Sequence, residues 1–172
     1  MSQGEIFMPS EQVVFRRRPM QVAGRVQFEG ASGQLTFRYL LSEPAGAPVI
    51  VEEGDGRYAL LRSFPAAAQL RTAANTITVG TEKYTLVAVR KLKVLDVSGK
   101  VPGIARDVPL VLSGIFEGPM GTLVREMVPG TPGQVYYLLK PLEAGEIVSA
   151  ARYAADRDAA ARAAGNRALD GN

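Results

Sequence analysis

Residues 20–42 read MQVAGRVQFEGASGQLTFRYLLS, and this stretch decides the class of fold. Apolar and polar side chains alternate on both sides of a Gly30–Gly33 break, with Arg25 and Arg38 at polar positions. A period of two is typical of a half-buried strand, and a glycine-rich break between two such runs is typical of a hairpin. We therefore predict two antiparallel strands here. The apolar positions are Met20, Val22, Val26 and Phe28 before the break, and Leu35, Phe37, Tyr39 and Leu41 after it.

The same pattern continues to about residue 141. Asp55-Gly56 predicts a tight hairpin turn, because this pair readily adopts positive φ angles. Residues 84–97 predict a long strand, covered on both sides at Leu86–Val89 because four successive residues are apolar. Many short strands with a turn about every 8–12 residues indicate an antiparallel β-sandwich or a partly open β-barrel. The other breaks are Gly80-Thr81, Gly118–Gly121 and Pro129–Gly133.

After Pro141 the composition shifts to alanine and arginine. Alanine is the best helix former, and Gly165 with Asn166 is a stop signal, so we predict a helix from about Leu142 to about Ala164. The chain then has three parts. They are a partly flexible N-terminal segment (1–19), a β domain (20–141) and an alanine-rich C-terminal helix with a frayed tail (142–172).

The composition excludes several kinds of chemistry. The 172 residues include no cysteine and no histidine, which rules out disulfides, zinc–thiolate sites, cysteine nucleophiles and Ser-His-Asp triads. We expect a protein that is not an enzyme and has no cofactor. The net charge of +3 is too small to be typical of a nucleic-acid binder. With no signal peptide and no long apolar run in the sequence, we expect no transmembrane segment and a cytoplasmic location.

Several short strand and turn segments carry a resemblance. They are Tyr39–Leu41, Pro48–Val51, Gly56–Tyr58, Lys83–Val87 and Gly114–Glu117. Through them, residues 37–149 resemble a bacterial family of β-rich domains of unknown function. The resemblance implies a β fold and supplies no catalytic residues.

Basic residues form the first group of candidate binding residues. Arg25, Arg38, Lys91 and Lys93 would line an anion or small-ligand groove if neighbouring strands brought them together. The alternative is that lysines on an edge strand protect the sheet from aggregation. Arg16-Arg17-Arg18 could contact phosphates, but charge runs are usually solvated, and we favour that interpretation.

Acidic residues form two further candidates. Glu52, Glu53 and Asp55 could bind a divalent cation, but their spacing does not match a calcium loop and a turn already explains Asp55, so we expect no metal site. Glu117 and Glu126 flank the Gly118–Gly121 turn. If they faced each other they would form the carboxylate pair of a hydrolase, which we keep as a third hypothesis.

The C-terminal helix is the strongest candidate for a partner contact. Ile147, Val148, Ala151 and Tyr153 give its first half an apolar surface, and alanine permits close helix approach. The alternative is a helix that caps its own sheet. Our leading hypothesis is a non-enzymatic binding or assembly module that acts through its β surface and this helix. Its partner would be another protein or a second copy of itself, and the alternative function is small-ligand or anion binding.

Overall fold

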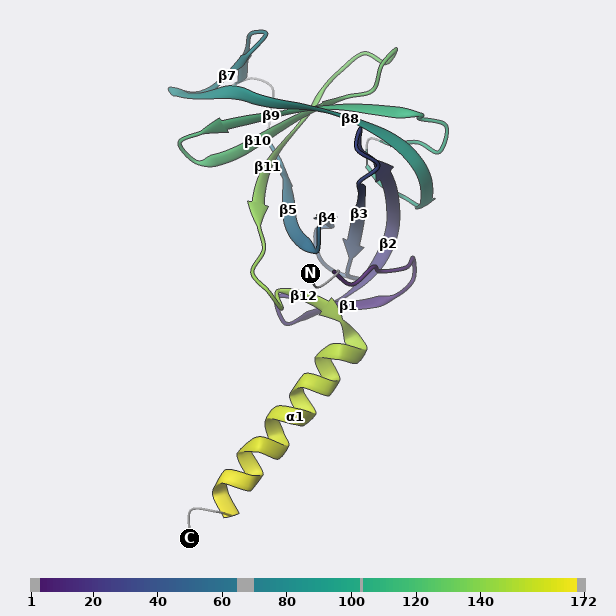
Figure 1. Ribbon diagram of the computed structural model, residues 1–172, viewed down its shortest axis with the longest axis vertical. Helices are drawn as coiled ribbons and strands as arrows, with labels where there is room; N and C mark the ends of the chain where they lie inside the picture. The colour runs from purple at the N-terminus through teal and green to yellow at the C-terminus, as the bar shows by residue number, and fades with distance from the viewer. Residues whose placement is uncertain (1–3, 65–69, 103, 170–172) are drawn as a thin grey trace.

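The computed structural model describes residues 4–64, 70–102 and 104–169 (Figure 1). Eight antiparallel strands form a closed barrel in the order β2-β3-β4-β5-β11-β10-β9-β8, and β8 pairs again with β2 to close it. The prediction of a β-barrel is confirmed, and its wall is closed rather than partly open. The strands are β2 (Arg18–Glu29), β3 (Leu35–Ser42), β4 (Val49–Gly54), β5 (Arg57–Ser63), β8 (Glu82–Gly99), β9 (Leu110–Gly118), β10 (Gly121–Met127) and β11 (Val135–Pro141).

Four short strands extend the sheet beyond the barrel. β1 (Gln12–Phe15) pairs with β2 and with β12 (Ile147–Ser149), while β7 (Thr76–Val79) pairs with β8 and with β6 (Leu70–Thr72). In Figure 1, β1 and β12 lie at the end of the barrel from which helix α1 (Ala150–Leu169) leaves, and β7 lies near the opposite end.

A β-bulge changes which residues share a face of β2. Val22 pairs with Leu41 and Gly24 pairs with Leu40, so Ala23 is an extra residue. A one-residue insertion inverts the alternation that follows it. Val22 therefore packs outside the barrel while Val26 packs inside it, and the prediction that they share one face is wrong.

Strand β3 is buried on both faces, and the prediction of a half-buried strand is wrong here. Phe37 and Tyr39 pack on the outside of the barrel, and Arg38 points into its interior with a side chain that is 1% exposed. The outer face is buried because the N-terminal segment covers it. Phe7 is fully buried, and its ring centroid lies 5.3 Å from that of Tyr39.

The described N-terminal residues, 4–19, are thus an integral part of the fold rather than a flexible lead-in. The first strand begins at Gln12 instead of Met20. Arg16 and Arg17 have φ angles of 49° and 66° and form the tight turn between β1 and β2. Arg16 Nε also lies 2.7 Å from Glu146 Oε1, so this arginine has a structural role.

The helix begins later than predicted. Residues 142–149 form a turn with Gly145 at φ 86° and then strand β12, because pairing with β1 outweighs the local helix preference. Ser149 caps α1: its Oγ accepts the N–H of Arg152 at 3.3 Å. The Glu5 carboxylate accepts the N–H of Ser149 at 3.0 Å. The helix passes the predicted stop at Gly165 and continues to Leu169, and the end of the predicted frayed tail lies outside the described residues.

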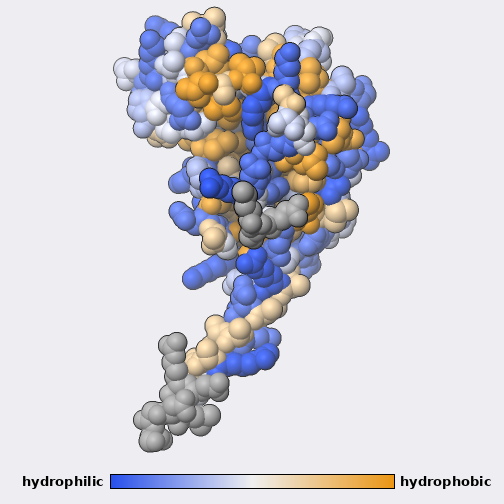
Figure 2. All heavy atoms as spheres, viewed as in Figure 1, coloured by the Kyte–Doolittle hydropathy of each residue, from blue (hydrophilic) through white to orange (hydrophobic). Residues whose placement is uncertain are grey.

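Beyond its first turn, α1 stands away from the barrel. The side chains of residues 154–165 are all exposed, and the main contacts of the helix are with β1 and β12. Figure 2 shows it as a mixture of pale alanine and blue charged side chains, while apolar surface gathers on the barrel. No helix in the described part of the chain is long and apolar enough to cross a membrane.

Gly24 provides a test of the bulge. A Cβ at this position would overlap the main-chain carbonyl oxygen of Lys100, which cannot move aside as a flexible side chain can. We expect Gly24→Ala to lower the free energy of unfolding by about 2–3 kcal/mol, measured by urea denaturation. Gly30→Ala is the matched control, since its Cβ would meet its nearest neighbour at an ordinary 3.6 Å. Equal losses in the two variants would contradict this account.

Candidate functional site

The barrel interior holds a buried ion-pair network centred on Arg38. Its two terminal nitrogens donate to both carboxylate oxygens of Glu126, at 2.8 and 2.7 Å. Nη2 also donates to Glu52 Oε2 at 2.6 Å. The Arg38 guanidinium lies 5.1 Å from the ring centroid of Phe28 and 5.8 Å from that of Tyr137, so aromatic faces complete its surroundings.

Arg90 brings a second cation into the network. Its Nη1 lies 3.1 Å from Glu52 Oε1, and its Nη2 lies 3.3 Å from Ser113 Oγ. The β3–β4 register places Arg38 opposite Glu52, and the β9 register places Ser113 between Arg90 and Glu126. Closure of the barrel then brings these two groups together across its interior, where two cations and two carboxylates balance.

This pairing fixes the charge state of the network. Burial alone would raise the pKa of the Glu52 carboxyl, but the guanidinium groups of Arg38 and Arg90 outweigh it and lower that pKa. Burial would likewise lower the pKa of Arg38, and the two carboxylates reverse that effect and raise it. Arg38 and Glu52 are therefore both charged at neutral pH.

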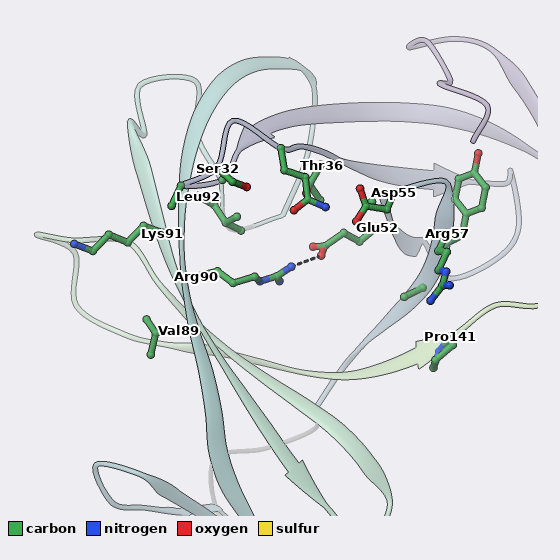
Figure 3. Close-up of a pocket in the computed structure, with 16 residues that line it drawn as sticks. Ser32, Thr36, Glu52, Asp55, Arg57, Val89, Arg90, Lys91, Leu92 and Pro141 are labelled. Carbon is green, nitrogen blue, oxygen red and sulfur yellow. Dashed lines mark hydrogen bonds and ion pairs between the residues drawn. The ribbon is translucent and has the colours of Figure 1, made fainter. Parts of the chain in front are cut away.

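A cavity of about 580 Å³ opens at the mouth of the barrel beside Arg90 (Figure 3). Arg90 is directed across it toward Glu52, while Lys91 points away. Its walls come from the β2–β3 hairpin, the β4–β5 hairpin, the middle of β8 and Pro141. We call this cavity the mouth cavity. Its polar lining residues are Ser32, Gln34, Thr36, Glu52, Asp55, Arg57, Tyr58, Arg90 and Lys91.

A smaller cavity of about 230 Å³ lies on the other side of the network. Glu126 and Tyr137 line it, together with apolar residues such as Ile104 and Val111. Arg38 therefore links a carboxylate of each cavity, because it binds both Glu52 and Glu126.

The four basic residues proposed from the sequence do not share one groove. Arg38 is inside the barrel, and Arg25 lies outside, 3.3 Å from Asp96 and stacked on Phe37. Lys93 lies 3.8 Å from Glu29. Lys91 is exposed and makes no ion pair within the described part of the chain. Only Lys91 borders the mouth cavity.

The acidic candidates are also placed differently from our hypotheses. Glu126 pairs with Ser113 in the hairpin register, and Glu117 pairs with Thr122, so the two glutamates lie about 13 Å apart along the strands. Glu52 and Glu53 point to opposite faces of β4, where Glu53 accepts the N–H of Gly56 at 2.9 Å. No group of three potential metal ligands occurs among the residues that the structure describes.

Two of the four partner-contact residues are used inside the fold. Ile147 and Val148 are 3% and 5% exposed, because β12 pairs with β1. They are not available to a partner, which corrects that part of the prediction. Ala151 is exposed and Tyr153 half-buried on the first turn of α1.

Sequence reasoning missed the network itself. The sequence patterns place Glu52 in an acidic cluster and Glu126 in a carboxylate pair. Arg38, Glu52 and Glu126 each interrupt or adjoin apolar strand residues, and this position was the sequence feature that indicated buried charges. Pairing them required the barrel closure, which no local pattern encodes.

The lowered pKa of Glu52 predicts a pH-dependent stability. Above the unfolded-state value of 4.5 both states are ionised and the stabilisation is complete. As the pH falls below it, the unfolded state takes up the proton first, so stability is lost until the folded-state pKa is passed. We expect Glu52→Gln to cost about 1.5–3 kcal/mol at pH 7 and to flatten this acid loss in urea unfolding measured from pH 7 to pH 3.

Glu53→Gln on the same strand is the control. Burial raises the pKa of Glu53, so its folded form holds the proton more readily and favours stability at low pH. Replacing Glu53 should therefore make the loss of stability at low pH steeper instead of flatter. The same flattening in both variants would contradict the role given to Glu52.

No protein-family model matches the chain, and no similar curated protein or solved structure was found. The resemblance of residues 37–149 to a bacterial family of β-rich domains stays a prediction.

Proposed function

We propose that this protein is a non-enzymatic binding module whose mouth cavity binds a small ligand carrying a carboxylate or a phosphate. The supporting observation is the position of Arg90. Its guanidinium lines a cavity of about 580 Å³, and its side chain stays 32% exposed although it pairs with Glu52. A cavity of this size is in the range of small-molecule sites.

The charges around the cavity favour an anion. Arg57 and Arg90 supply two positive charges against the two of Glu52 and Asp55. The charge of Glu52 is already shared between Arg38 and Arg90. A ligand carboxylate or phosphate therefore meets an Arg90 guanidinium that Glu52 neutralises only in part.

The geometry also favours tight positioning. Glu52 and Ser113 hold Arg90 in place, so little side-chain entropy is lost when a ligand binds it. Ser32, Gln34 and Thr36 add neutral hydrogen-bonding groups.

Arg57 allows a test that leaves the buried network intact. It is exposed at the rim of the mouth cavity, and Arg62 is also exposed on the same strand but lies outside that cavity. We expect succinate and inorganic phosphate to shift the amide NMR signals of Gly30 and Gly54. Arg57→Gln should raise the dissociation constant about tenfold, which corresponds to about 1.4 kcal/mol. Arg62→Gln should leave the dissociation constant unchanged. The same dissociation constant in both variants and the unmodified chain, or no binding at all, would contradict the proposal.

We propose as a second function that α1 joins the protein to another chain, with a second copy as the simplest partner. The supporting observation is that this helix leaves the barrel and exposes residues 154–165 (Figure 1). Most helices in proteins are stabilised by packing an apolar face, and an isolated helix is marginal in water. Ala151 and Tyr153 remain on its accessible first turn.

Removal of the helix tests this second function. We expect light scattering during size exclusion to give the full chain a mass above that of the 18.4 kDa monomer. A chain ending at Ser149 should give the monomer mass and keep its cooperative unfolding, because α1 contributes little to the barrel. The same number of subunits in both chains would argue against self-association through α1.

A further inference from the structure

We infer that strand β8 binds an extended acidic segment of a partner protein, which adds to the barrel as a strand along Val87–Leu92. The choice of acidic side chains rests on the proposed anion site in the mouth cavity. The main-chain pairing rests on a separate observation, which is a gap in the hydrogen-bonded neighbours of β8.

The gap lies between two strands on the same side of β8. Residues 82–85 of β8 pair with β7, and residues 93–99 pair with β2. On the other side, β9 pairs with β8 across residues 85–93. Within the described ranges, no strand pairs with residues 87–92 on the β7 and β2 side, so this stretch is a free sheet edge.

The free edge presents main-chain donors and acceptors. Val94 donates its N–H toward the β9 side, to Pro109 O at 3.0 Å. Main-chain groups alternate in direction along an antiparallel strand, so Leu92 and Arg90 also face β9. Val89 and Lys91 therefore direct their N–H and C=O groups to the open side, where an added strand would receive them.

The side chains of this edge also favour a partner. Val87 and Val89 are 59% and 63% exposed, although their sequence predicts burial on both sides. Lysines on edge strands discourage pairing, but here only Lys91 faces outward beside two exposed valines. An added strand would cover these valines and remove apolar surface from water.

Charge decides between the candidate occupants. From Lys83 to Leu95, β8 carries four basic residues and no acidic one. A second copy paired edge to edge would place like charges beside each other, which is unfavourable. An acidic strand would instead match them, and its residue opposite Arg90 would point into the mouth cavity. The six residues of the edge span about 20 Å, which suits a segment of six or seven residues.

Amide hydrogen exchange, followed by NMR on the full chain, tests this inference directly. The probe is the capped heptapeptide Val-Glu-Val-Glu-Val-Glu-Val, and the control has lysine in place of each glutamate. We expect the acidic peptide to slow exchange at Val89 and Lys91 at least tenfold. Arg90 and Leu92, which face β9, should not change, and they serve as internal controls.

A variant tests the main-chain pairing. Val89→Pro removes one edge N–H and should be tolerated, because proline is accepted where an edge N–H faces solvent. It should abolish the protection of Lys91 by the acidic peptide. If this variant does not fold, exchange in the unmodified chain still decides the outcome.

Three results would overturn the inference. They are unchanged exchange at millimolar peptide, equal protection by the lysine peptide, and protection of Val89 and Lys91 before any peptide is added. In the last case, protection that falls on dilution would identify a second copy as the occupant.

If succinate binds and the peptide gives no protection, only this inference fails. If the peptide protects the edge and succinate does not bind, the proposed small-ligand function fails instead.

Discussion

The ion pairs of Arg38 inside the barrel are the interaction on which the rest of the structure depends. A guanidinium that is 1% exposed must be neutralised, and Glu52 and Glu126 do this from two different strands. Leaving such a charge unpaired costs about 3–5 kcal/mol. The pairing therefore favours the β3–β4 register that puts Arg38 opposite Glu52, and it favours the barrel closure that brings β10 across the interior.

Placing Arg38 inside has consequences for the outside of the barrel. The alternate residues of β3, Phe37 and Tyr39, then point outward and require cover. The N-terminal segment supplies it through Phe7, whose ring packs between Tyr39 and Tyr58. The same segment carries Glu5, which binds the cap of α1 at Ser149. The N-terminal segment and the start of α1 thus meet on one face of the barrel.

The proposed site uses the accessible end of the same network. Arg90 belongs to the buried charges through Glu52, and it also reaches the mouth cavity. The middle of β8 supplies both this side chain and the free edge beside it. Glu52 therefore connects the proposed site to the buried network, because the charge that holds Arg90 in position also neutralises Arg38.

Short-range patterns in the sequence determined the strands, the turns and the presence of a helix. The Asp55-Gly56 turn has the expected positive φ angles, and the long strand at residues 84–97 lies within β8. These features depend on neighbours along the chain, since turn geometry and helix propensity are local. The absence of histidine and cysteine was also evident from the sequence alone.

Only the tertiary structure decided which face of each strand is buried and which charges meet. Alternation in β3 gave the correct period, but a barrel has an inside and an outside, and both faces of β3 are covered. The bulge at Ala23 exchanged the faces of β2, and β12 replaced the expected start of the helix. Arg38, Glu52, Glu126 and Arg90 come together only through closure of the sheet, because contacts across a barrel depend on the register of all its strands.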